Sequence, residues 1–328
     1  MNQTAVVILN YNGEDYLKKF LPSVITYSKD AEVIVVDNKS TDQSIEVLAN
    51  DFPEVKVIEF AENYGYAGGY NKALERIDAT YVVLLNSDIE VTPNWLTPLI
   101  DFLDTHPDYA ACQPKIKDFN DQTKFEYAGA SGGYLDSLGY PYCRGRIFNT
   151  IEKDLGQYDQ PADIFWATGA CLVIKTEIFN QVGGLDTDFF AHMEEIDLCW
   201  RIQSMGLKIK AVPSSQVYHV GGGTLSKLNP TKTYLNFRNG LYMLIKNLPG
   251  KDLLLKIPIR ITLDWIAALK FIFEGNTKHG FAVWRAHFSM LAKLSIMLKK
   301  RVLTSPILSK KVVITDYYLR GKRKFDEL

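Results

Sequence analysis

Four short apolar runs, each leading into polar residues, constrain the fold of this chain more than any other feature of its sequence. They lie at Ala5–Tyr11, Glu32–Asn38, Val55–Phe60 and Thr80–Asp88. Helix-like segments separate them, at Tyr16–Tyr27, Ser44–Asn50 and Tyr70–Ile77. Continuous apolar runs are typical of strands covered on both faces, and strands that alternate with single helices form βαβ units. The sequence therefore predicts an α/β fold with a mostly parallel, Rossmann-like sheet flanked by helices.

The rest of the chain shows a weaker pattern and then a change of character. From about 107 to 161 the apolar pattern loosens among Gly, Tyr and Asp residues, which predicts long loops or an insertion. Apolar runs return at Phe165–Lys175 and Leu207–Thr224. Two amphipathic segments, Leu253–Phe273 and Phe281–Arg301, then predict long helices. We expect an α/β domain at residues 1–225 and a helical C-terminal region at 226–328.

The net charge of −1 conceals two oppositely charged parts. Residues 241–328 carry 17 Lys and Arg against 6 Asp and Glu, a net charge of +11, and residues 1–240 carry a net charge of −12. Basic helices with broad apolar faces indicate a helix pair lying on an anionic membrane surface. Packing against the α/β core, or against a second copy of the chain in a homo-oligomer, is the alternative. Nucleic acid is not expected as a partner, because the basic helices lack an aromatic stacking surface or a recognition motif.

The N-terminus and the cysteines bear on location. A strand-like run begins at once, without the basic and long apolar regions of a signal peptide. No uncharged apolar run approaches the ~18 residues of a membrane-spanning helix. The four cysteines have no zinc-like spacing, which predicts reduced thiols. We expect the protein in the cytoplasm, peripheral at the inner face of the cell membrane.

Polar residues collect where the predicted strands end, at Asn10, Asn12, Asp37, Asn63, Asn86 and Asp88. Ligands bind at the carboxyl ends of the strands in such a sheet. Asp88 could hold a divalent cation beside a diphosphate, or it could be an ordinary turn residue. Gly68, Gly69 and Asn71 stand at the start of a predicted helix, where backbone N–H groups can meet an anion or a ribose. A tight turn is the alternative for these glycines.

Three acids, Glu194, Glu195 and Asp197, stand among large apolar residues in the stretch "FFAHMEEIDLCWR". They could form a helix start, because the helix dipole favours acidic side chains in the first turn. One of them could instead be a catalytic base. On a helix, Glu194 and Asp197 share a face and Glu195 points about 100° away, so all three cannot face one substrate.

The motifs "VVILNYNGEDYL", "EVIVVDNKSTDQS", "ENYGYAGGYNKAL", "VVLLNSDIEV", "TGACLVIKTEIFNQVGGLD", "FFAHMEEIDLCWR" and "VYHVGGGT" occur in this order. Over Ala5–Leu248 the chain resembles family 2 glycosyltransferases of the GT-A fold, in the rhamnosyltransferase-like branch. The resemblance implies an inverting enzyme that moves a sugar from a nucleoside-diphosphate sugar, dTDP-rhamnose or a UDP-sugar, with GDP-sugars open. The implied acceptor is a hydroxyl of a glycan or polyprenyl-linked lipid in surface polysaccharide synthesis, and the implied cofactor is Mg²⁺ or Mn²⁺.

The resemblance also assigns roles to the strand-end residues. Asp37 resembles the acid that contacts the nucleotide base, with Asn10 and Asn12 in the same pocket. The implied loop around base and ribose comprises Asn63, Gly68, Gly69 and Asn71. Asn86 and Asp88 are similar to the DxD element in an NxD form, so Asp88 is the implied metal ligand, and His219 looks like the His that completes the metal site.

Glu195 matches the position of the catalytic base, where the family commonly has Asp. Glu194 competes for this role, and Asp197 is expected to support the site or cap the helix. The acceptor side, from about 107, is expected to include Trp166, Thr168 and Gly169. Arg238 and Asn239 could reach phosphates or form a surface salt bridge.

Two other functions stay open. One is a catalytically weak nucleotide-sugar binding protein, because Glu195 and Asn86 depart from the usual acids. The other is a sugar nucleotidyltransferase, which shares the βαβ front but carries a Lys-bearing N-terminal loop that is absent from this sequence.

Overall fold

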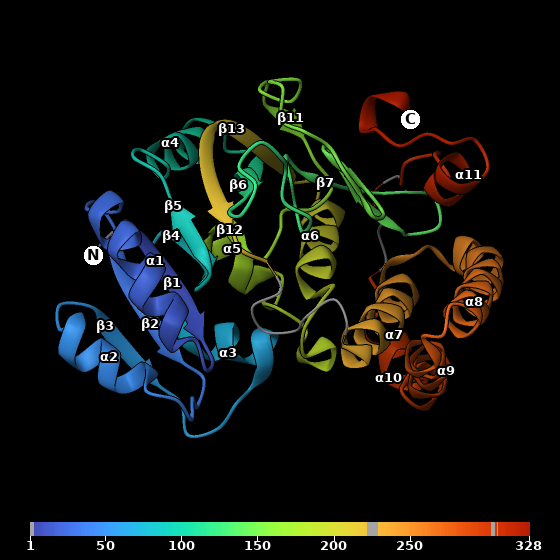
Figure 1. Ribbon diagram of the computed structural model, residues 1–328, viewed down its shortest axis with the longest axis horizontal. Helices are drawn as coiled ribbons and strands as arrows, with labels where there is room; N and C mark the ends of the chain where they lie inside the picture. Colours follow the sequence, from blue (N-terminus) through green and yellow to red (C-terminus); the bar gives the residue numbers. More distant parts are fainter. Residues whose placement is uncertain (1–2, 222–228, 303–305, 307) are drawn as a thin grey trace.

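A nine-stranded sheet forms the centre of the α/β part of the protein (Figure 1). The computed structural model describes residues 3–221, 229–302, 306 and 308–328. Along the sheet the order is β11-β13-β6-β12-β4-β1-β2-β3, and β5 pairs with β13. The strands are β1 Thr4–Asn10, β2 Glu32–Asp37, β3 Lys56–Glu59, β4 Tyr81–Asn86, β5 Ile89–Val91, β6 Tyr109–Asp118, β11 Ala162–Asp163, β12 Cys171–Lys175 and β13 Lys208–His219.

The predicted parallel arrangement of the N-terminal strands is confirmed. Strands β3, β2, β1 and β4 run parallel to one another, so their carboxyl ends meet at one edge of the sheet. Beyond β4 the sheet is mixed, because β12 runs antiparallel to both β4 and β6. Strands β6 and β13 are again parallel.

Helices cover both faces of this sheet, as the continuous apolar strands require. Ala5 and Val7 of β1 belong to one buried cluster, and Val6 and Ile8 belong to the other. The first cluster includes apolar side chains of α3 Gly65–Leu74, α5 Thr176–Gln181 and α6 Glu194–Ser204. The second includes those of α1 Glu14–Tyr27, α2 Ser44–Asp51 and α4 Thr97–Thr105.

The prediction of long loops or an insertion for 107–161 is wrong at its start. Residues Tyr109–Asp118 form β6, a long strand in the middle of the sheet. Its buried Gln113 and Lys115 flank Pro114 and interrupt the apolar run, so the sequence hides a strand whose partners come from far along the chain. A small four-stranded antiparallel sheet follows, made of β7 Gly133–Leu135, β8 Pro141–Cys143, β9 Arg146–Ile147 and β10 Thr150–Ile151.

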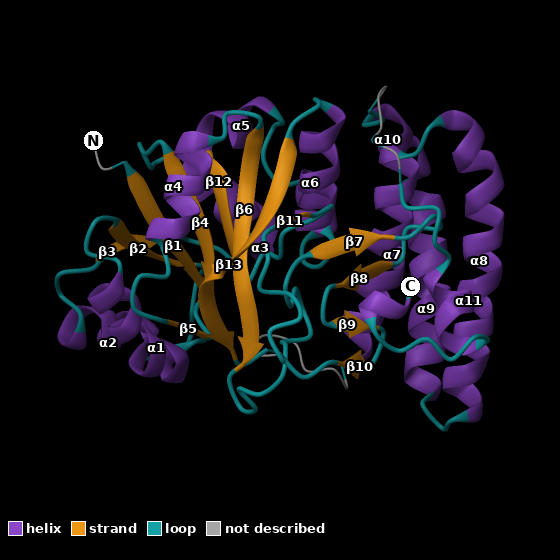
Figure 2. Cartoon of the chain, turned by 90° about the horizontal axis from the view of Figure 1, so that it is seen from above, coloured by secondary structure: helices purple, strands orange, loops and turns teal. Residues whose placement is uncertain are grey.

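The C-terminal helices stand beside the sheet, with β7–β10 between them and β13 (Figure 2). Helix α7 packs against α9, and α9 packs against α8. The helices are α7 Pro230–Asn247, α8 Gly250–Phe273, α9 Thr277–Ala292, α10 Leu294–Lys299 and α11 Val313–Tyr318, and two 3-10 turns lie at Thr187–Phe189 (η1) and Phe325–Glu327 (η2). The segment Phe281–Arg301, predicted as one helix, is divided into α9 and α10 at Lys293.

The predicted boundary between residues 225 and 226 lies outside the described residues, so the division into domains stays a prediction. Among the helices of the described ranges, none combines the length and the apolar character that crossing a bilayer requires.

Helix α8 turns its polar stripe toward the protein. Arg260 and Asp264 are buried and form an ion pair of 3.2 Å, and Arg260 donates to the carbonyl oxygen of Leu138 at 3.1 Å. The opposite face carries apolar side chains in solvent, such as Phe273, which is 86% exposed, and α9 adds Phe288, which is 72% exposed. The amphipathic pattern of α8 is therefore inverted relative to a helix that covers a core, whereas α9 also buries apolar side chains such as Val283 and Met290.

Candidate functional site

A cavity of about 1600 Å³ lies between the main sheet and the C-terminal helices. Its wall is built from the ends of β1, β4 and β13, the start of α6, and residues of α7, α8 and α11. Small-molecule pockets usually measure roughly 300–1,000 Å³. The cavity is therefore large enough for two ligands at once, at the sheet edge where α/β proteins bind them.

Four asparagines, Asn12, Asn38, Asn63 and Asn86, line the sheet side of the cavity. Asn38 Nδ2 donates to Asn63 Oδ1 at 3.0 Å and to the carbonyl oxygen of Gly65 at 3.1 Å, which ties the end of β2 to the start of α3. The predicted residues Asn12, Asn63 and Asn86 thus meet in one cavity although they follow three different strands.

Asn10 and Asp37 are buried and are not among the residues that line the cavity. Asn10 Nδ2 donates to Asp37 Oδ1 at 3.1 Å, and the other Asp37 oxygen accepts from Ser40 N at 2.9 Å. This pair holds the ends of β1 and β2 together. A direct contact of Asp37 with a nucleotide base stays a prediction.

Gly68, Gly69 and Asn71 lie inside α3, which begins at Gly65 instead of near Tyr70 as predicted. A Cβ on Gly69 would lie 2.8 Å from Leu9 Cδ1, so the absent side chain lets α3 approach β1 closely. Asn71 donates to the Leu185 carbonyl oxygen at 2.7 Å and accepts from Leu185 N at 2.9 Å. None of these three residues is among those that line the cavity, so their contact with the base and ribose of the donor stays a prediction.

Asp88 and His219 lie side by side on the cavity wall, although 131 residues separate them in sequence. His219 Nε2 is 3.0 Å from Asp88 Oδ1. On the other side of the ring, Glu126 Oε1 is 3.4 Å from Nδ1. All three side chains are buried, and Glu126 also lines the cavity.

These carboxylates control the charge of the His219 imidazole. Burial opposes its protonation, but Glu126 and Asp88 outweigh burial and raise the pKa of His219 to about 10. Burial also opposes the charge on Asp88, yet His219 brings the pKa of Asp88 below its usual value. The described residues contain no cluster of three or more His, Cys, Asp or Glu arranged for a metal ion. One carboxylate oxygen and one imidazole nitrogen backed by a carboxylate nevertheless fit Mg²⁺ or Mn²⁺, provided that ligand oxygens and water complete the coordination.

Glu194 and Glu195 begin α6, and both line the cavity. The Oε2 atom of each is buried and has no hydrogen-bond partner among the described residues. Burial, followed by the charge of Glu195, raises the pKa of Glu194 well above its usual value. Burial raises the pKa of Glu195 to about 7. Burial therefore favours the protonated form of both carboxyls, and the pKa of Glu195 lies near neutral pH.

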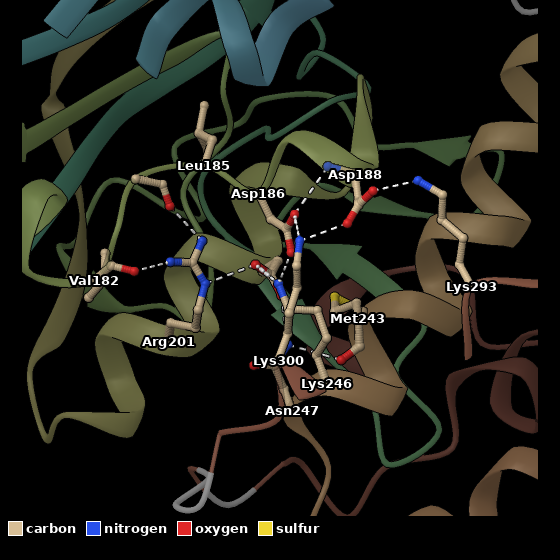
Figure 3. A network of polar contacts seen from close by, with 12 residues as sticks. Val182, Leu185, Asp186, Asp188, Arg201, Met243, Lys246, Asn247, Lys293 and Lys300 are labelled. Carbon is tan, nitrogen blue, oxygen red and sulfur yellow. Dashed lines mark hydrogen bonds and ion pairs between the residues drawn. The ribbon is translucent and has the colours of Figure 1, made fainter. Parts of the chain in front are cut away.

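Asp197 is not among the residues that line the cavity, and it belongs to a buried ion-pair network between α6 and α7. Figure 3 shows its partners Arg201, Lys246 and Asn247. It accepts hydrogen bonds of 2.9 Å from Arg201 Nε and Lys246 Nζ and one of 2.8 Å from Asn247 Nδ2. The three acids do not all line the cavity, and the two that do are Glu194 and Glu195. The cavity adjoins the first turn of α6, where both glutamates reach it, and Asp197 turns into the helix interface.

The predicted acceptor-side residues Trp166, Thr168 and Gly169 all line the cavity. Tyr66 donates to the Gly169 carbonyl oxygen at 2.6 Å, which joins this segment to α3. Arg238 also lines the cavity, and its guanidinium donates to the carbonyl oxygen of Phe189 at 2.9 Å. Asn239 is fully buried, so it reaches neither a phosphate nor the surface.

The sequence profile described as "Glycosyl transferase family 2" matches residues 5–183, more than half of the chain. The chain belongs to this family. Its activity is therefore glycosyl transfer, and the motifs that predicted it are those that meet in the cavity.

Relatives of this glycosyltransferase act in glycan synthesis. An N-acetylglucosaminyl-diphospho-decaprenol L-rhamnosyltransferase of Mycobacterium tuberculosis is 27% identical over 65% of this chain and 75% of that protein. The rhamnosyltransferase WbbL of Escherichia coli is 26% identical over 65% of this chain and 82% of its own length. A low-salt glycan biosynthesis hexosyltransferase of Haloferax volcanii, Agl10, is 25% identical over 73% of this chain and 74% of that one. These relatives place the glycosyltransferase in a rhamnosyltransferase-like group of polysaccharide synthesis.

Solved structures show that the fold is GT-A. A mannosyltransferase from Pyrobaculum calidifontis in complex with GDP-Man and Mn²⁺ superposes with a TM-score of 0.52 and 15% identity, over 89% of this chain and 75% of that one. GalNAc-T7 with UDP, GalNAc and Mn²⁺ superposes with a TM-score of 0.53 and 20% identity, over 66% of this chain and 43% of that one.

Two cavity residues of the glycosyltransferase escaped the sequence analysis. Glu126 lies in residues 107–161, where the apolar pattern is weak and no motif includes it. Only the folded chain brings it next to His219. His192 stands inside the motif that contains Glu194 and Glu195, which was a usable signal. Its Nε2 is buried without a partner among the described residues, and burial, with repulsion from Lys232, brings the pKa of His192 to about 4.

Proposed function

We propose that this glycosyltransferase inverts the anomeric centre in a single displacement, with Glu195 as the base. One observation carries the proposal. Glu194 and Glu195 each have a buried carboxylate oxygen without a partner among the described residues, and both residues line the cavity that Asp88 and His219 also line. A base works best when its pKa lies near the operating pH, and burial brings the pKa of Glu195 to about 7. The raised pKa of Glu194 favours its protonated form, in which a carboxyl donates a hydrogen bond, so we assign the role of the base to Glu195.

The bonding changes in this reaction balance without a covalent intermediate. The oxygen of the acceptor hydroxyl attacks the anomeric carbon and forms the new glycosidic bond. The bond from that carbon to the diphosphate oxygen breaks, and its electron pair leaves with the nucleoside diphosphate. The hydroxyl proton passes to Glu195, which must lie within hydrogen-bond reach of the attacking oxygen in the complex.

Asp88 and His219 are the proposed ligands of a divalent cation, Mg²⁺ or Mn²⁺. When bound, such a cation neutralises charge on the departing diphosphate. Glu126 is placed to orient His219 from behind, a common arrangement for metal-ligating histidines. Bound metal and a proton on His219 exclude one another, so metal affinity should fall with falling pH.

The proposed donor is dTDP-rhamnose or a UDP-sugar. Two relatives are rhamnosyltransferases, which favours rhamnose, and the four asparagines on the sheet side of the cavity offer the hydrogen-bond donors and acceptors that a nucleoside requires. The proposed acceptor is a hydroxyl of a glycan or of a polyprenyl-linked sugar in surface polysaccharide synthesis.

The outward apolar faces of α8 and α9 support a lipid-linked acceptor at a membrane. Leu263, Ile266 and Phe271 of α8 line the cavity, while Phe273 at the end of the same helix is exposed. We propose that this face inserts into the cytoplasmic leaflet, with anionic lipids attracted by the basic C-terminal region, and that the protein is peripheral at the inner face of the membrane. The alternative to membrane insertion is a homo-oligomer in which a second copy of the chain covers the same face.

The proposal is tested by incubating the full chain with a panel of nucleoside-diphosphate sugars and Mn²⁺ or Mg²⁺. A true donor should raise the thermal stability of the protein by mass action and should slowly release nucleoside diphosphate. Sizing the protein alone and with vesicles then separates a dimer from a membrane-bound monomer. Absence of any stabilising or hydrolysed donor in either metal would contradict the proposal.

A further inference from the structure

The turn that leads into α6 has an unusual backbone. Phe190, His192 and Met193 have φ angles of 65°, 69° and 72°, in the left-handed region that bulky residues rarely adopt. Such a conformation persists only where its surroundings determine it, and it recurs at active sites. This turn ends directly at Glu194.

One side chain contacts three carbonyl oxygens of this turn. Asn239 is fully buried on α7, and its Nδ2 lies 3.0, 2.8 and 2.7 Å from the carbonyl oxygens of Phe189, Ala191 and His192. Its Oδ1 accepts from Arg238 Nε at 2.9 Å, which orients the amide with its donor end toward the turn. The opposite side of the turn is held by Tyr66 N, which donates to the Phe190 carbonyl oxygen at 3.0 Å.

Three polar side-chain atoms in and directly after this turn make no hydrogen bond to the described residues. His192 Nε2, Glu194 Oε2 and Glu195 Oε2 are buried, lie in residues that line the cavity, and have no partner among the described residues. Buried polar groups are normally paired, so unpaired atoms concentrated on one turn point to a ligand as their partner.

We propose that Asn239 is the positioning residue of the active site: it binds three carbonyl oxygens of residues 189–192 and thereby holds the strained turn that aims His192, Glu194 and Glu195 into the cavity. This inference rests on the proposed role of Glu195. Asn239 itself does not line the cavity, so it acts through the turn and not on the substrate.

Asparagine suits this role because it combines a donor for carbonyl oxygens with an acceptor for Arg238 in a small, uncharged group. Alanine removes the donor, and aspartate keeps the shape but places acceptor oxygens against carbonyl oxygens. In both variants the turn should relax toward ordinary φ angles. A displacement of about 1 Å at a reacting group can cost about a hundredfold in rate.

The test compares Asn239→Ala and Asn239→Asp with Asn247→Ala in the full chain. Asn247 is an equally buried amide on α7, and it bonds Asp197 and the Met243 carbonyl oxygen, not the turn. Measurements are kcat and KM for transfer, donor affinity by thermal shift, and the pH dependence of kcat. Asn239→Ser is measured as well. It keeps a small polar side chain and replaces the other two variants in the test if they do not fold.

In the Asn239 variants we expect kcat to fall about a hundredfold, with donor affinity unchanged. The pKa seen in the pH dependence should fall toward that of an ordinary carboxyl, because the acids become hydrated. The Asn247 variant should lose stability but keep kcat within about threefold. Equal losses of kcat in both series, or an unchanged pH dependence in the Asn239 variants, would show that Asn239 serves only the fold. A wild-type protein that transfers no sugar at all would instead refute the proposed function.

Discussion

Replacing Glu195 by Gln preserves the size of the side chain and removes its ability to accept a proton. If Glu195 is the base, the rate of transfer should fall by about 10²–10⁴-fold, the usual contribution of general acid–base catalysis. The affinity for the sugar donor should be unchanged, because Glu195 stands on α6 and is not one of the four asparagines proposed to bind the nucleoside. In the wild type, transfer should increase with pH around the pKa of Glu195, about 7.

The same substitution should stabilise the protein in a pH-dependent way. Burial raises the pKa of Glu195 from its usual 4.5 to about 7, so between these values the folded protein holds a proton that the unfolded chain has released. The stability of the wild type therefore falls as pH rises through this window. At about 1.36 kcal/mol per pKa unit, the ionised carboxylate costs the folded state at most about 3 kcal/mol above pH 7.

Urea unfolding of both proteins at pH 4 and pH 8 measures this difference. The gain from Glu195→Gln should be near zero at pH 4 and should reach up to about 3 kcal/mol at pH 8. Glu194→Gln is the matched control, since Glu194 is the neighbouring buried carboxyl, burial and Glu195 raise its pKa, and its replacement should reduce transfer less. Near-normal transfer by Glu195→Gln with intact donor binding would refute its role as the base, and a stability difference independent of pH would refute the burial argument.

Three further outcomes are expected. His219→Ala should abolish the thermal stabilisation that Mn²⁺ and nucleoside diphosphate confer together while the wild type keeps it; equal stabilisation of both would exclude His219 as a ligand. His192→Phe should lower kcat/KM about tenfold, because one hydrogen bond to the ligand is lost. The ratio of kcat/KM between variant and wild type should stay constant from pH 6 to 8, because the pKa of His192 is about 4. Phe273→Ser should weaken flotation with anionic vesicles about tenfold or more, whereas Leu155→Ser, at a residue 84% exposed on the α/β part, should not; equal effects would contradict insertion of α8.

Much of the front of the fold was predictable because its signals are local. Strands β1, β2 and β4 carry buried side chains on both faces, so each contains a continuous apolar run, and the polar residues at their ends mark the sheet edge. Strand β6 was not predictable in this way. Gln113 is satisfied by the distant Thr168, whose backbone N–H donates to its Oε1 at 3.0 Å, so a polar residue occupies the core without a local signal.

The choice among the three acids required the packing of α6. Helical periodicity correctly separates Asp197 from Glu195 but cannot tell which side meets the cavity. Lys246 and Asn247 of α7 draw Asp197 into the interface, and the glutamates are left at the open end of the helix.

By itself the sequence determined the α/β class, the parallel front of the sheet and the family, because apolar periodicity and ordered motifs are properties of neighbouring residues. Only the tertiary structure decided that Glu126 stands behind His219, that Asn239 holds the turn before Glu194, and that α8 shows its apolar face to the outside. Each of these depends on how elements distant in the chain pack together, and the sequence carries no local signal for such an angle or distance.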